Sequence, residues 1–363
     1  MTYNSHLQNR LSRRTLLTFA LILTALISTE GSYAQHQHAD KMKRQEGQQQ
    51  YAQLGKCKLE NGQTIESCRL GYRTYGTLNK NKTNGVLIPT WFTGDSKSHA
   101  FLADKNLIDP EKYFIVVVDA FGNGVSSSPS NSDGQPGESF PRFTIGDLVE
   151  SQHRLLETEF GIHSLHAVVG ISMGGMQAFE WAVRYPGFAT KTVSAIGSPR
   201  LAAFNIALWE TRNRILALYR DCECVNATAA LSGFGYLLMV PEKVEELAPR
   251  ENVSESLHEL GKAQFTNLSS LQTWDQQRQA EAMITHNIAE GLRNDMNSAA
   301  AITESEFLIV VSADDRVVTP APALAFAELV GAQIEIMDHD CGHGDLTCAP
   351  NKFAGFVQSF LNK

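Results

Sequence analysis

The chain has 363 residues, of which 43% are hydrophobic, and its formal net charge at pH 7 is −8. This length is enough for one large domain with an insertion. The acidic balance and the lack of a basic run argue against a nucleic-acid partner. The sequence shows no internal repeat, no glycine-rich nucleotide loop and no two Cys-x-x-Cys pairs, so it predicts neither a cofactor nor a metal ion.

The first 34 residues have the pattern of an export signal. Arg13 and Arg14 precede an apolar run that ends near Ile27, and Ser32-Tyr33-Ala34 supplies small residues for cleavage. The run is too short to serve as a stable membrane anchor. The paired arginines favour a twin-arginine signal, with Sec export from an ordinary basic region as the alternative. We therefore predict a signal peptide over residues 1–34 and a protein exported to the periplasm or the extracellular space.

Changes of composition divide the rest of the chain. Residues 35–53 are rich in glutamine, histidine and lysine, which predicts a flexible leader rather than a metal site. Strand and helix patterns fill residues 54–198 and 302–363, the two predicted parts of one core domain. Between them, residues 199–301 lack strand patterns and read as helices over 201–219 and 274–296, which predicts an inserted helical cap. The aromatic residues of this cap either pack in its core, which is the commoner role, or line an acyl pocket. They are Phe204, Trp209, Phe234, Tyr236 and Trp274.

Eight segments have the apolar runs or the alternation of β-strands. They are residues 57–59, 69–74, 86–89, 114–118, 165–169, 192–196, 307–311 and 333–337. Continuous apolar runs such as 115–118 suit the centre of a parallel sheet that is covered on both faces. Helical patterns over 145–160, 175–185, 322–330 and 351–361 would supply the covering layers through right-handed crossovers. The predicted fold class is α/β, with a mostly parallel eight-stranded sheet flanked by helices.

Six cysteines occur in the predicted exported part, and an even number in such a protein indicates disulfides. They form three pairs that are close in sequence: Cys57 with Cys68, Cys222 with Cys224, and Cys341 with Cys348. The first pair flanks a hairpin-like turn at residues 60–62, and the last pair brackets His343, so we expect a bridge in each. Cys222 and Cys224 are left open between a strained bridge and two free thiols. Six cysteines allow fifteen pairings, among which sequence alone does not select.

The most informative motif is Gly170-Ile171-Ser172-Met173-Gly174, between a predicted strand and a predicted helix. A strand, a sharp Gly-x-Ser-x-Gly turn and a helix make the nucleophile elbow of the α/β-hydrolase fold. The glycines allow a strained backbone that exposes the serine hydroxyl. The same turn directs the backbone N–H of Met173 to where an oxyanion would form. An ordinary strand-to-helix turn is the alternative. We predict Ser172 as the nucleophile and Met173 as an oxyanion donor.

A serine nucleophile needs a base and an acid, which follow in the order Ser, Asp, His in this fold. The seventh predicted strand runs into Asp314 and Asp315, and the eighth is followed by His339 and His343. All four lie past the carboxyl ends of strands, where open α/β sheets build their sites. We prefer His343 because glycines flank it. We prefer Asp315 because such acid loops run from the aspartate through two or three residues to a proline, and Asp314 is the alternative acid.

At these residues the chain resembles the homoserine O-acetyltransferase family of the α/β-hydrolases. The most similar stretch is residues 167–182, followed by Tyr185-Pro186, and further similar segments are 92–95, 113–116, 122–128 and 140–145. The resemblance implies the α/β-hydrolase fold and the triad Ser172, Asp315 and His343. In the family the second oxyanion donor is a backbone N–H after the third strand, which carries over to Phe92.

These residues predict acyl transfer through an acyl-enzyme on Ser172. Because acetyl-CoA is a cytoplasmic donor, export favours ester hydrolysis, and the alternative is an O-acyltransferase that acts on a homoserine-like hydroxyl. A non-catalytic binding protein on the same fold is disfavoured because all three triad positions are filled. The expected partner is a small-molecule acyl substrate, and a homodimer is left open.

Overall fold

The computed structural model describes residues 46–222, 227, 230–231, 233–235, 268–339 and 341–363. Residues 47–363 form one compact unit. The predicted signal peptide, most of the predicted leader, part of the predicted cap with Tyr236, and Cys224 of the pair with Cys222 lie outside the described residues. These expectations therefore stay predictions.

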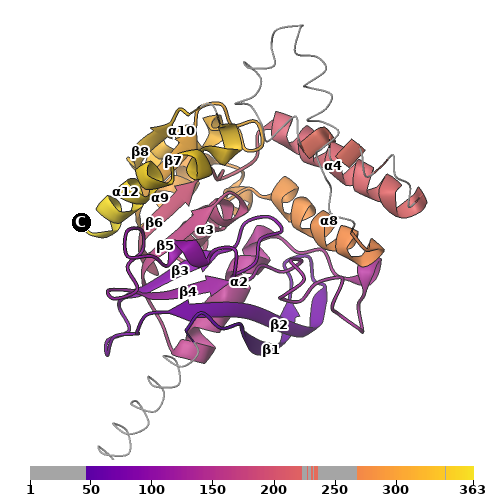
Figure 1. Cartoon of the computed structure of the whole chain (residues 1–363), viewed down its shortest axis with the longest axis horizontal. Helices are drawn as coiled ribbons and strands as arrows, with labels where there is room; N and C mark the ends of the chain where they lie inside the picture. The colour runs from indigo at the N-terminus through magenta and orange to yellow at the C-terminus, as the bar shows by residue number, and fades with distance from the viewer. Residues whose placement is uncertain (1–45, 223–226, 228–229, 232, 236–267, 340) are drawn as a thin grey trace, which may run out of the picture. The chain divides into compact units, whose positions relative to one another are not determined.

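The sheet has eight strands in the order β1-β2-β4-β3-β5-β6-β7-β8 (Figure 1). Strand β2 is antiparallel to both its neighbours, and all the other neighbouring pairs are parallel. The strands are β1 (Gln50–Lys58), β2 (Thr64–Tyr75), β3 (Gly85–Pro89), β4 (Phe114–Val118), β5 (Leu165–Ile171), β6 (Ala189–Ala195), β7 (Glu306–Ser312) and β8 (Gln333–Met337). The predicted fold class is thus confirmed.

The first strand begins earlier than its sequence indicates. β1 starts at Gln50, so residues 50–53 belong to the sheet and the prediction of a flexible leader is wrong for them. Ala52 and Leu54 are buried while their neighbours are exposed, and the strand pairs with β2 throughout. An edge strand with one solvated face carries many polar residues. That composition concealed the alternation.

Helices come from the connections between the parallel strands. They are α2 (Ile145–Leu155), α3 (Met173–Arg184), α4 (Ala203–Cys222), α8 (Ser270–Thr285), α9 (Met296–Ala301), α10 (Ala321–Val330), α11 (Asp345–Cys348) and α12 (Pro350–Leu361). Short 3₁₀ turns lie at Ala100–Leu102, Gly137–Ser139, Glu290–Leu292 and Gly342–Gly344, and α2 continues as a π-helical turn over Leu156–Phe160.

The helix predicted over residues 274–296 is wrong at both ends. Helix α8 begins earlier, where Ser269 accepts a hydrogen bond from the N–H of Gln272 and the two residues form a capping box. It ends at Thr285, because His286 has an extended backbone and Asn287 pairs with Arg200 in an isolated bridge. The polar runs around both ends carried no periodic signal for these boundaries.

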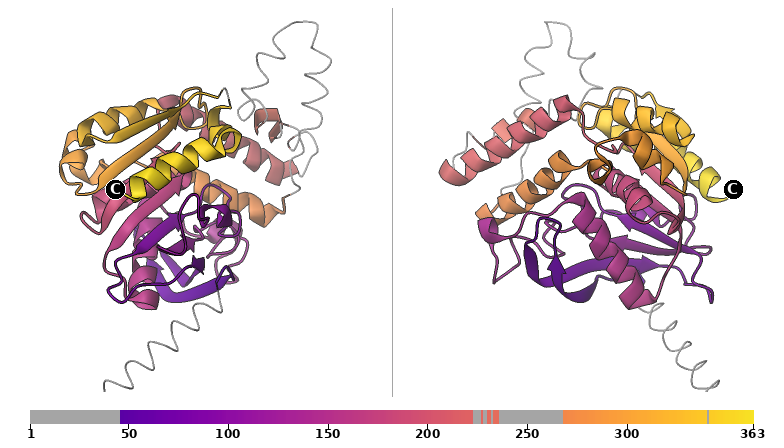
Figure 2. Two further views of the ribbon diagram at one scale, coloured as in Figure 1. Left: turned by 60° about the vertical axis from the view of Figure 1, so that its left-hand side comes forward. Right: turned by 180° about the vertical axis from the view of Figure 1, so that it is seen from behind.

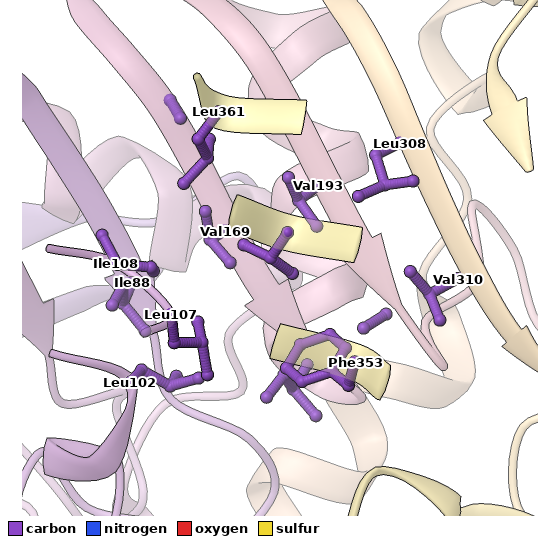
Figure 3. Close-up of a cluster of buried hydrophobic side chains, with 14 of the residues drawn as sticks. Ile88, Leu102, Leu107, Ile108, Val169, Val193, Leu308, Val310, Phe353 and Leu361 are labelled. Carbon is purple, nitrogen blue, oxygen red and sulfur yellow. The ribbon is translucent and has the colours of Figure 1, made fainter. Parts of the chain in front are cut away.

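Two helical layers enclose the sheet, as expected of buried parallel strands. Helix α12 covers one face, where Figure 3 shows Phe353 and Leu361 lying against Val169, Val193 and Leu308. On the other face, residues of α3, α9 and α10 pack against β7. Every residue of β3 and of β4 is buried. This packing fixes the strand ends from which the site residues project.

The predicted cap segment contributes two long helices to the described structure, α4 and α8, which lie side by side (Figures 1 and 2). Two disulfides lie among the described residues, Cys57–Cys68 between β1 and β2, and Cys341–Cys348 beyond β8. None of the helices in the described ranges is long and apolar enough to cross a membrane.

Candidate active site

Ser172 is held in a strained turn between β5 and α3. Its backbone has φ 57° and ψ −120°, a region that is costly for a residue with a side chain, by about 1–3 kcal/mol. The turn is tight on both sides. A Cβ at position 170 would lie 1.9 Å from the Gly174 carbonyl oxygen, and a Cβ at position 174 would lie 2.5 Å from that of Pro89. Only glycine fits at these two positions, which explains the motif.

Three side chains form a continuous hydrogen-bonded chain. The Ser172 Oγ lies 2.9 Å from Nε2 of His343, and Nδ1 of His343 lies 2.7 Å from Oδ2 of Asp315. The residues come from three loops, each at the carboxyl end of a strand: β5, β7 and β8. Asp315 is buried and His343 is largely so. With Nδ1–H donating to Asp315, Nε2 is free to accept the serine proton.

The alternative residues lie outside this chain. Asp314 is exposed, and among the described residues it makes no hydrogen bond or ion pair. His339 is partly exposed and lies 4.0 Å from Asp338, with no contact to Ser172. Asp315 is also the better fixed acid, because its Oδ1 accepts N–H bonds from Val317 and Val318 at 2.8 and 2.9 Å.

The two expected oxyanion donors each carry a free backbone N–H. Met173 begins α3 directly after Ser172, and Phe92 lies in the loop after β3. Within the part of the chain that the structure describes, neither N–H donates to a protein acceptor. Phe92 belongs to a turn closed by a 3.0 Å hydrogen bond from the Gly94 N–H to the Trp91 carbonyl oxygen. Free donors of this kind are what a developing oxyanion needs.

His99 supports the loop that carries Phe92. Its Nε2 accepts from the Trp91 N–H at 3.1 Å, and its Nδ1 lies 2.8 Å from the Asp95 carbonyl oxygen. Burial lowers the pKa of His99 to about 4, so the ring is neutral at pH 7 and Nδ1 carries the proton. The sequence offered no context for this histidine, whose Nδ1 also lies 3.2 Å from the hydroxyl of its neighbour Ser98.

Asn205, the third residue of α4, holds the acid loop. Its Nδ2 donates to the carbonyl oxygens of Arg316 and Val317, both at 3.0 Å. Its Oδ1 accepts from the hydroxyl of Thr319 at 2.7 Å and from the N–H of the same residue at 3.2 Å. Asn205 is buried. This role was missed from sequence, because Asn205 and the loop it holds are more than a hundred residues apart.

One face of α4 lies beside Phe92. The ring of Trp209 packs edge-on against Phe92 at 4.9 Å between centroids, and the guanidinium of Arg212 lies 4.8 Å from the Phe92 ring centre. Three polar atoms on this face are buried and have no hydrogen-bond partner among the described residues: Trp209 Nε1, Arg212 Nη1 and Asn213 Oδ1. Burial lowers the pKa of Arg212 to about 10, which leaves it charged at pH 7.

The other expected aromatics differ in their surroundings. Phe204 is exposed, Phe234 is half-buried, and Trp274 lies between Arg220 and Arg278 at 3.8 and 5.1 Å. Of the aromatics assigned to core packing or an acyl pocket, Trp209 is thus the one among those described that contacts a predicted site residue.

His343 lies inside a small disulfide loop. It occupies the 3₁₀ turn Gly342–Gly344, between the bridged Cys341 and Cys348. The Cys341 N–H also donates to Oδ1 of the buried Asp345 at 3.0 Å. The bridge and this hydrogen bond both restrain the backbone that carries the histidine.

No group of three His, Cys, Asp or Glu side chains in the described ranges is arranged to hold a metal ion. A cavity of about 690 Å³ lies behind α3, lined among others by Glu180, Arg184 and His286. It does not include Ser172. Arg184 pairs there with both Glu180 and Glu60. The cavity is therefore separate from the hydrogen-bonded chain.

Comparison with known proteins finds similarity in sequence over part of the chain. Residues 86–214 match the family described as alpha/beta hydrolase fold. An ethyl acetate hydrolase of Pseudomonas veronii is 44% identical over 150 residues, which cover 40% of this chain and 43% of that protein. A homoserine O-acetyltransferase of Methanosalsum zhilinae is 37% identical over 170 residues, covering 41% of this chain and 34% of that protein. The chain thus matches less than half the length of either relative.

Comparison with a solved structure shows that the similarity in fold covers most of the chain. An acetylester hydrolase from Corynebacterium glutamicum superimposes with a TM-score of 0.73 and 26% identity, over 86% of this chain and 94% of that one. The resemblance read from the sequence is confirmed. The chain therefore has the α/β-hydrolase fold and is similar to enzymes named esterase and homoserine O-acetyltransferase.

Proposed function

We propose that the protein is a serine acyl hydrolase that cleaves small esters through Ser172, His343 and Asp315. The observation that carries the proposal is the hydrogen-bonded chain from Ser172 Oγ through His343 to a buried carboxylate. The names of the relatives, ethyl acetate hydrolase and acetylester hydrolase, support an acetyl ester as the substrate.

In the proposed mechanism, Ser172 Oγ attacks the ester carbonyl carbon while Nε2 of His343 takes the serine proton. The Met173 and Phe92 N–H groups stabilise the oxyanion, each contributing about 3 kcal/mol to the lowering of the barrier. The C–O bond to the alcohol then breaks, and His343 returns the proton to the leaving oxygen. Water, deprotonated by the same histidine, then attacks the acyl-enzyme. The bond between the acyl carbon and Ser172 Oγ breaks, His343 returns the proton to Oγ, and the acid is released. Asp315 holds the required tautomer and stabilises the imidazolium.

Acyl transfer to a polar hydroxyl is a second candidate. The α4 face beside Phe92 carries Trp209 Nε1, Arg212 Nη1 and Asn213 Oδ1, which offer both donors and an acceptor and have no partner in the described part of the chain. Such groups suit an acceptor alcohol with its own polar substituents, and the similarity to a homoserine O-acetyltransferase supports this reading.

We propose further that the protein is exported. The paired arginines, the short apolar run and the small residues before Gln35 support a cleaved signal. The two disulfides also support it, because such bridges persist in oxidising compartments. Fractionation of cells that produce the full chain, with N-terminal sequencing of the exported protein, tests this proposal. Recovery of uncleaved protein in the cytoplasm alone would reject it.

One assay separates the two chemistries. The purified protein is incubated with p-nitrophenyl acetate in water, and separately with acetyl-CoA and homoserine. We expect ester turnover in the first reaction and no O-acetylhomoserine in the second. Transfer without ester hydrolysis would replace the hydrolase with the second candidate.

A nucleophile variant tests the site itself. Ser172→Ala should lower turnover by roughly a million-fold, as loss of a serine nucleophile does in subtilisin. A fluorophosphonate should label the native protein at Ser172. Covalent labelling at another serine would show that the site is misplaced.

A further inference from the structure

The loop that carries Phe92 contains a strained threonine. In the turn from Trp91 to Gly94, the third residue is Thr93, with φ 60°. A turn with positive φ at its third residue favours glycine there, because a side chain crowds the backbone. The cost is larger for a β-branched residue such as threonine. The turn therefore needs a contact that keeps it in this conformation.

Gln279 of α8 makes that contact. Its Oε1 accepts from the Thr93 N–H at 2.8 Å, and its Nε2 donates to the Phe121 carbonyl oxygen at 2.9 Å. The side chain is fully buried. The amide is fixed in this orientation, because the reverse would place NH₂ against the Thr93 N–H and oxygen against the Phe121 carbonyl.

Helix α8 is itself anchored to the core, so the position of Gln279 is well defined. Arg278 donates to the carbonyl oxygens of Phe140 and Glu138 at 3.1 and 2.8 Å. Asp275 accepts from the Ser130 N–H at 2.8 Å. Both residues lie within about one helical turn of Gln279 on its N-terminal side.

The hydrogen bonds of residues 91–94 use every backbone N–H in this run except one. The Trp91 N–H donates to His99, the Thr93 N–H to Gln279, and the Gly94 N–H to the Trp91 carbonyl oxygen. In this run of described residues, the N–H of Phe92 alone has no protein acceptor. The contacts that shape the turn therefore leave free the group expected to bind the oxyanion.

We propose that Gln279 is a positioning residue of the oxyanion hole: by accepting from Thr93, it holds the turn that aims the Phe92 N–H. This inference rests on the proposed acyl chemistry at Ser172. It gives the cap segment a part in building the catalytic centre, since α8 lies between β6 and β7 in sequence and reaches the loop after β3. Gln279 touches no reacting atom and acts through Thr93.

The test compares two identical substitutions on α8. Gln279→Met keeps the size of the side chain and removes both hydrogen bonds. Gln277→Met is the control, because the Gln277 amide contacts Arg220 and Glu281 and not the core. Each variant is measured for kcat and KM on p-nitrophenyl acetate, for thermal stability, and for inhibition by a trifluoromethyl ketone. The hemiketal that the ketone forms on Ser172 carries the oxyanion.

For Gln279→Met we expect kcat to fall by about tenfold to a hundredfold, less than the 10²–10³ lost with a whole oxyanion donor. KM should stay within about twofold. The ketone should bind more weakly by the same factor as kcat/KM falls, because both depend on the oxyanion. Gln277→Met should keep the native kcat and ketone affinity.

Two results would overturn the inference. One is a Gln279→Met protein that keeps native kcat and ketone affinity. The other is an equal loss in Gln277→Met, which would trace the effect to packing of α8. Failure of the proposed function is a separate outcome, because it appears as unchanged turnover in Ser172→Ala, whatever Gln279 does.

Discussion

Asp315 contacts His343 through one carboxylate oxygen only, Oδ2, at 2.7 Å, while its Oδ1 is fully occupied by two backbone N–H groups. The hydrogen bonds to Oδ1 therefore hold the carboxylate in place independently of the histidine. In the proposed mechanism, His343 therefore meets a carboxylate that is already oriented and needs no reorganisation when the imidazolium forms.

Substitution of each aspartate should therefore show which of the two, Asp315 or Asp314, is the acid. Asp315→Asn should lower kcat on the order of ten-thousand-fold, because the amide favours the wrong histidine tautomer, as in the serine-protease triad. Asp314→Asn should have little effect, since its side chain is exposed and outside the hydrogen-bonded chain. Steady-state kinetics on p-nitrophenyl acetate measures both. A reversed order of the two losses would move the acid to Asp314.

Asn205 should matter to turnover more than its distance from the chemistry indicates. Asn205→Ala leaves the Arg316 and Val317 carbonyl oxygens without their donor, at a cost of about 1–3 kcal/mol in the free energy of unfolding. The loop that anchors Asp315 then loosens. We expect kcat to fall on the order of tenfold, by analogy with the loss from small misplacements of catalytic groups.

The matched control for Asn205 is Glu210→Ala, an exposed position on the same helix. It should leave both kcat and the melting temperature unchanged. A normal kcat in a destabilised Asn205→Ala protein would show that the asparagine serves the fold alone.

The parts of the site that sequence predicted are those whose signals are local. Ser172 is marked by the glycines beside it, and His343 by the strand before it and its own flanking glycines. Asp315 was separated from Asp314 by its distance to Pro320. In each case the residues that explain the position lie within a few places along the chain.

The supporting residues could not be predicted in this way, because their partners are distant in sequence. Asn205 forms hydrogen bonds with a loop more than a hundred residues away in sequence. Gln279 accepts a hydrogen bond from Thr93 across a still larger sequence separation. An asparagine or glutamine in a polar helix gives no sequence pattern from which such distant partners could be identified. The same lack of pattern explains the misplaced ends of α8, whose start depends on a capping box at Ser269.

Asp275 should make the protein less stable as pH rises. Burial is the main cause that raises its pKa from 3.8 to about 6, against the opposing hydrogen bonds from Ser130. A carboxyl with a raised pKa in the folded state favours folding below its unfolded pKa, and that contribution is lost as pH rises towards 6. At pH 7 the loss is on the order of 3 kcal/mol, at 1.36 kcal/mol for each unit of pKa.

Asp275→Asn isolates this effect, because the amide oxygen can still accept from the Ser130 N–H. The variant should melt at a higher temperature than the native protein at pH 7 and at a similar temperature at pH 4. Calorimetry at the two pH values is the measurement. Equal melting temperatures at pH 7 would mean that the buried carboxylate is solvated or paired in solution.

The Cys341–Cys348 bridge should support activity more than global stability. It closes a short loop around His343, which in the chain-entropy model contributes about 2 to 3 kcal/mol. Replacing both cysteines, Cys341→Ser with Cys348→Ser, should lower kcat because the backbone that carries the base can loosen locally before the protein unfolds. The control is the double variant Cys57→Ser with Cys68→Ser, whose bridge joins β1 to β2. That variant should melt at a lower temperature than the native protein and keep the native kcat. If the two double variants lose stability alike and both keep native kcat, the bridge beyond β8 does not restrain the histidine.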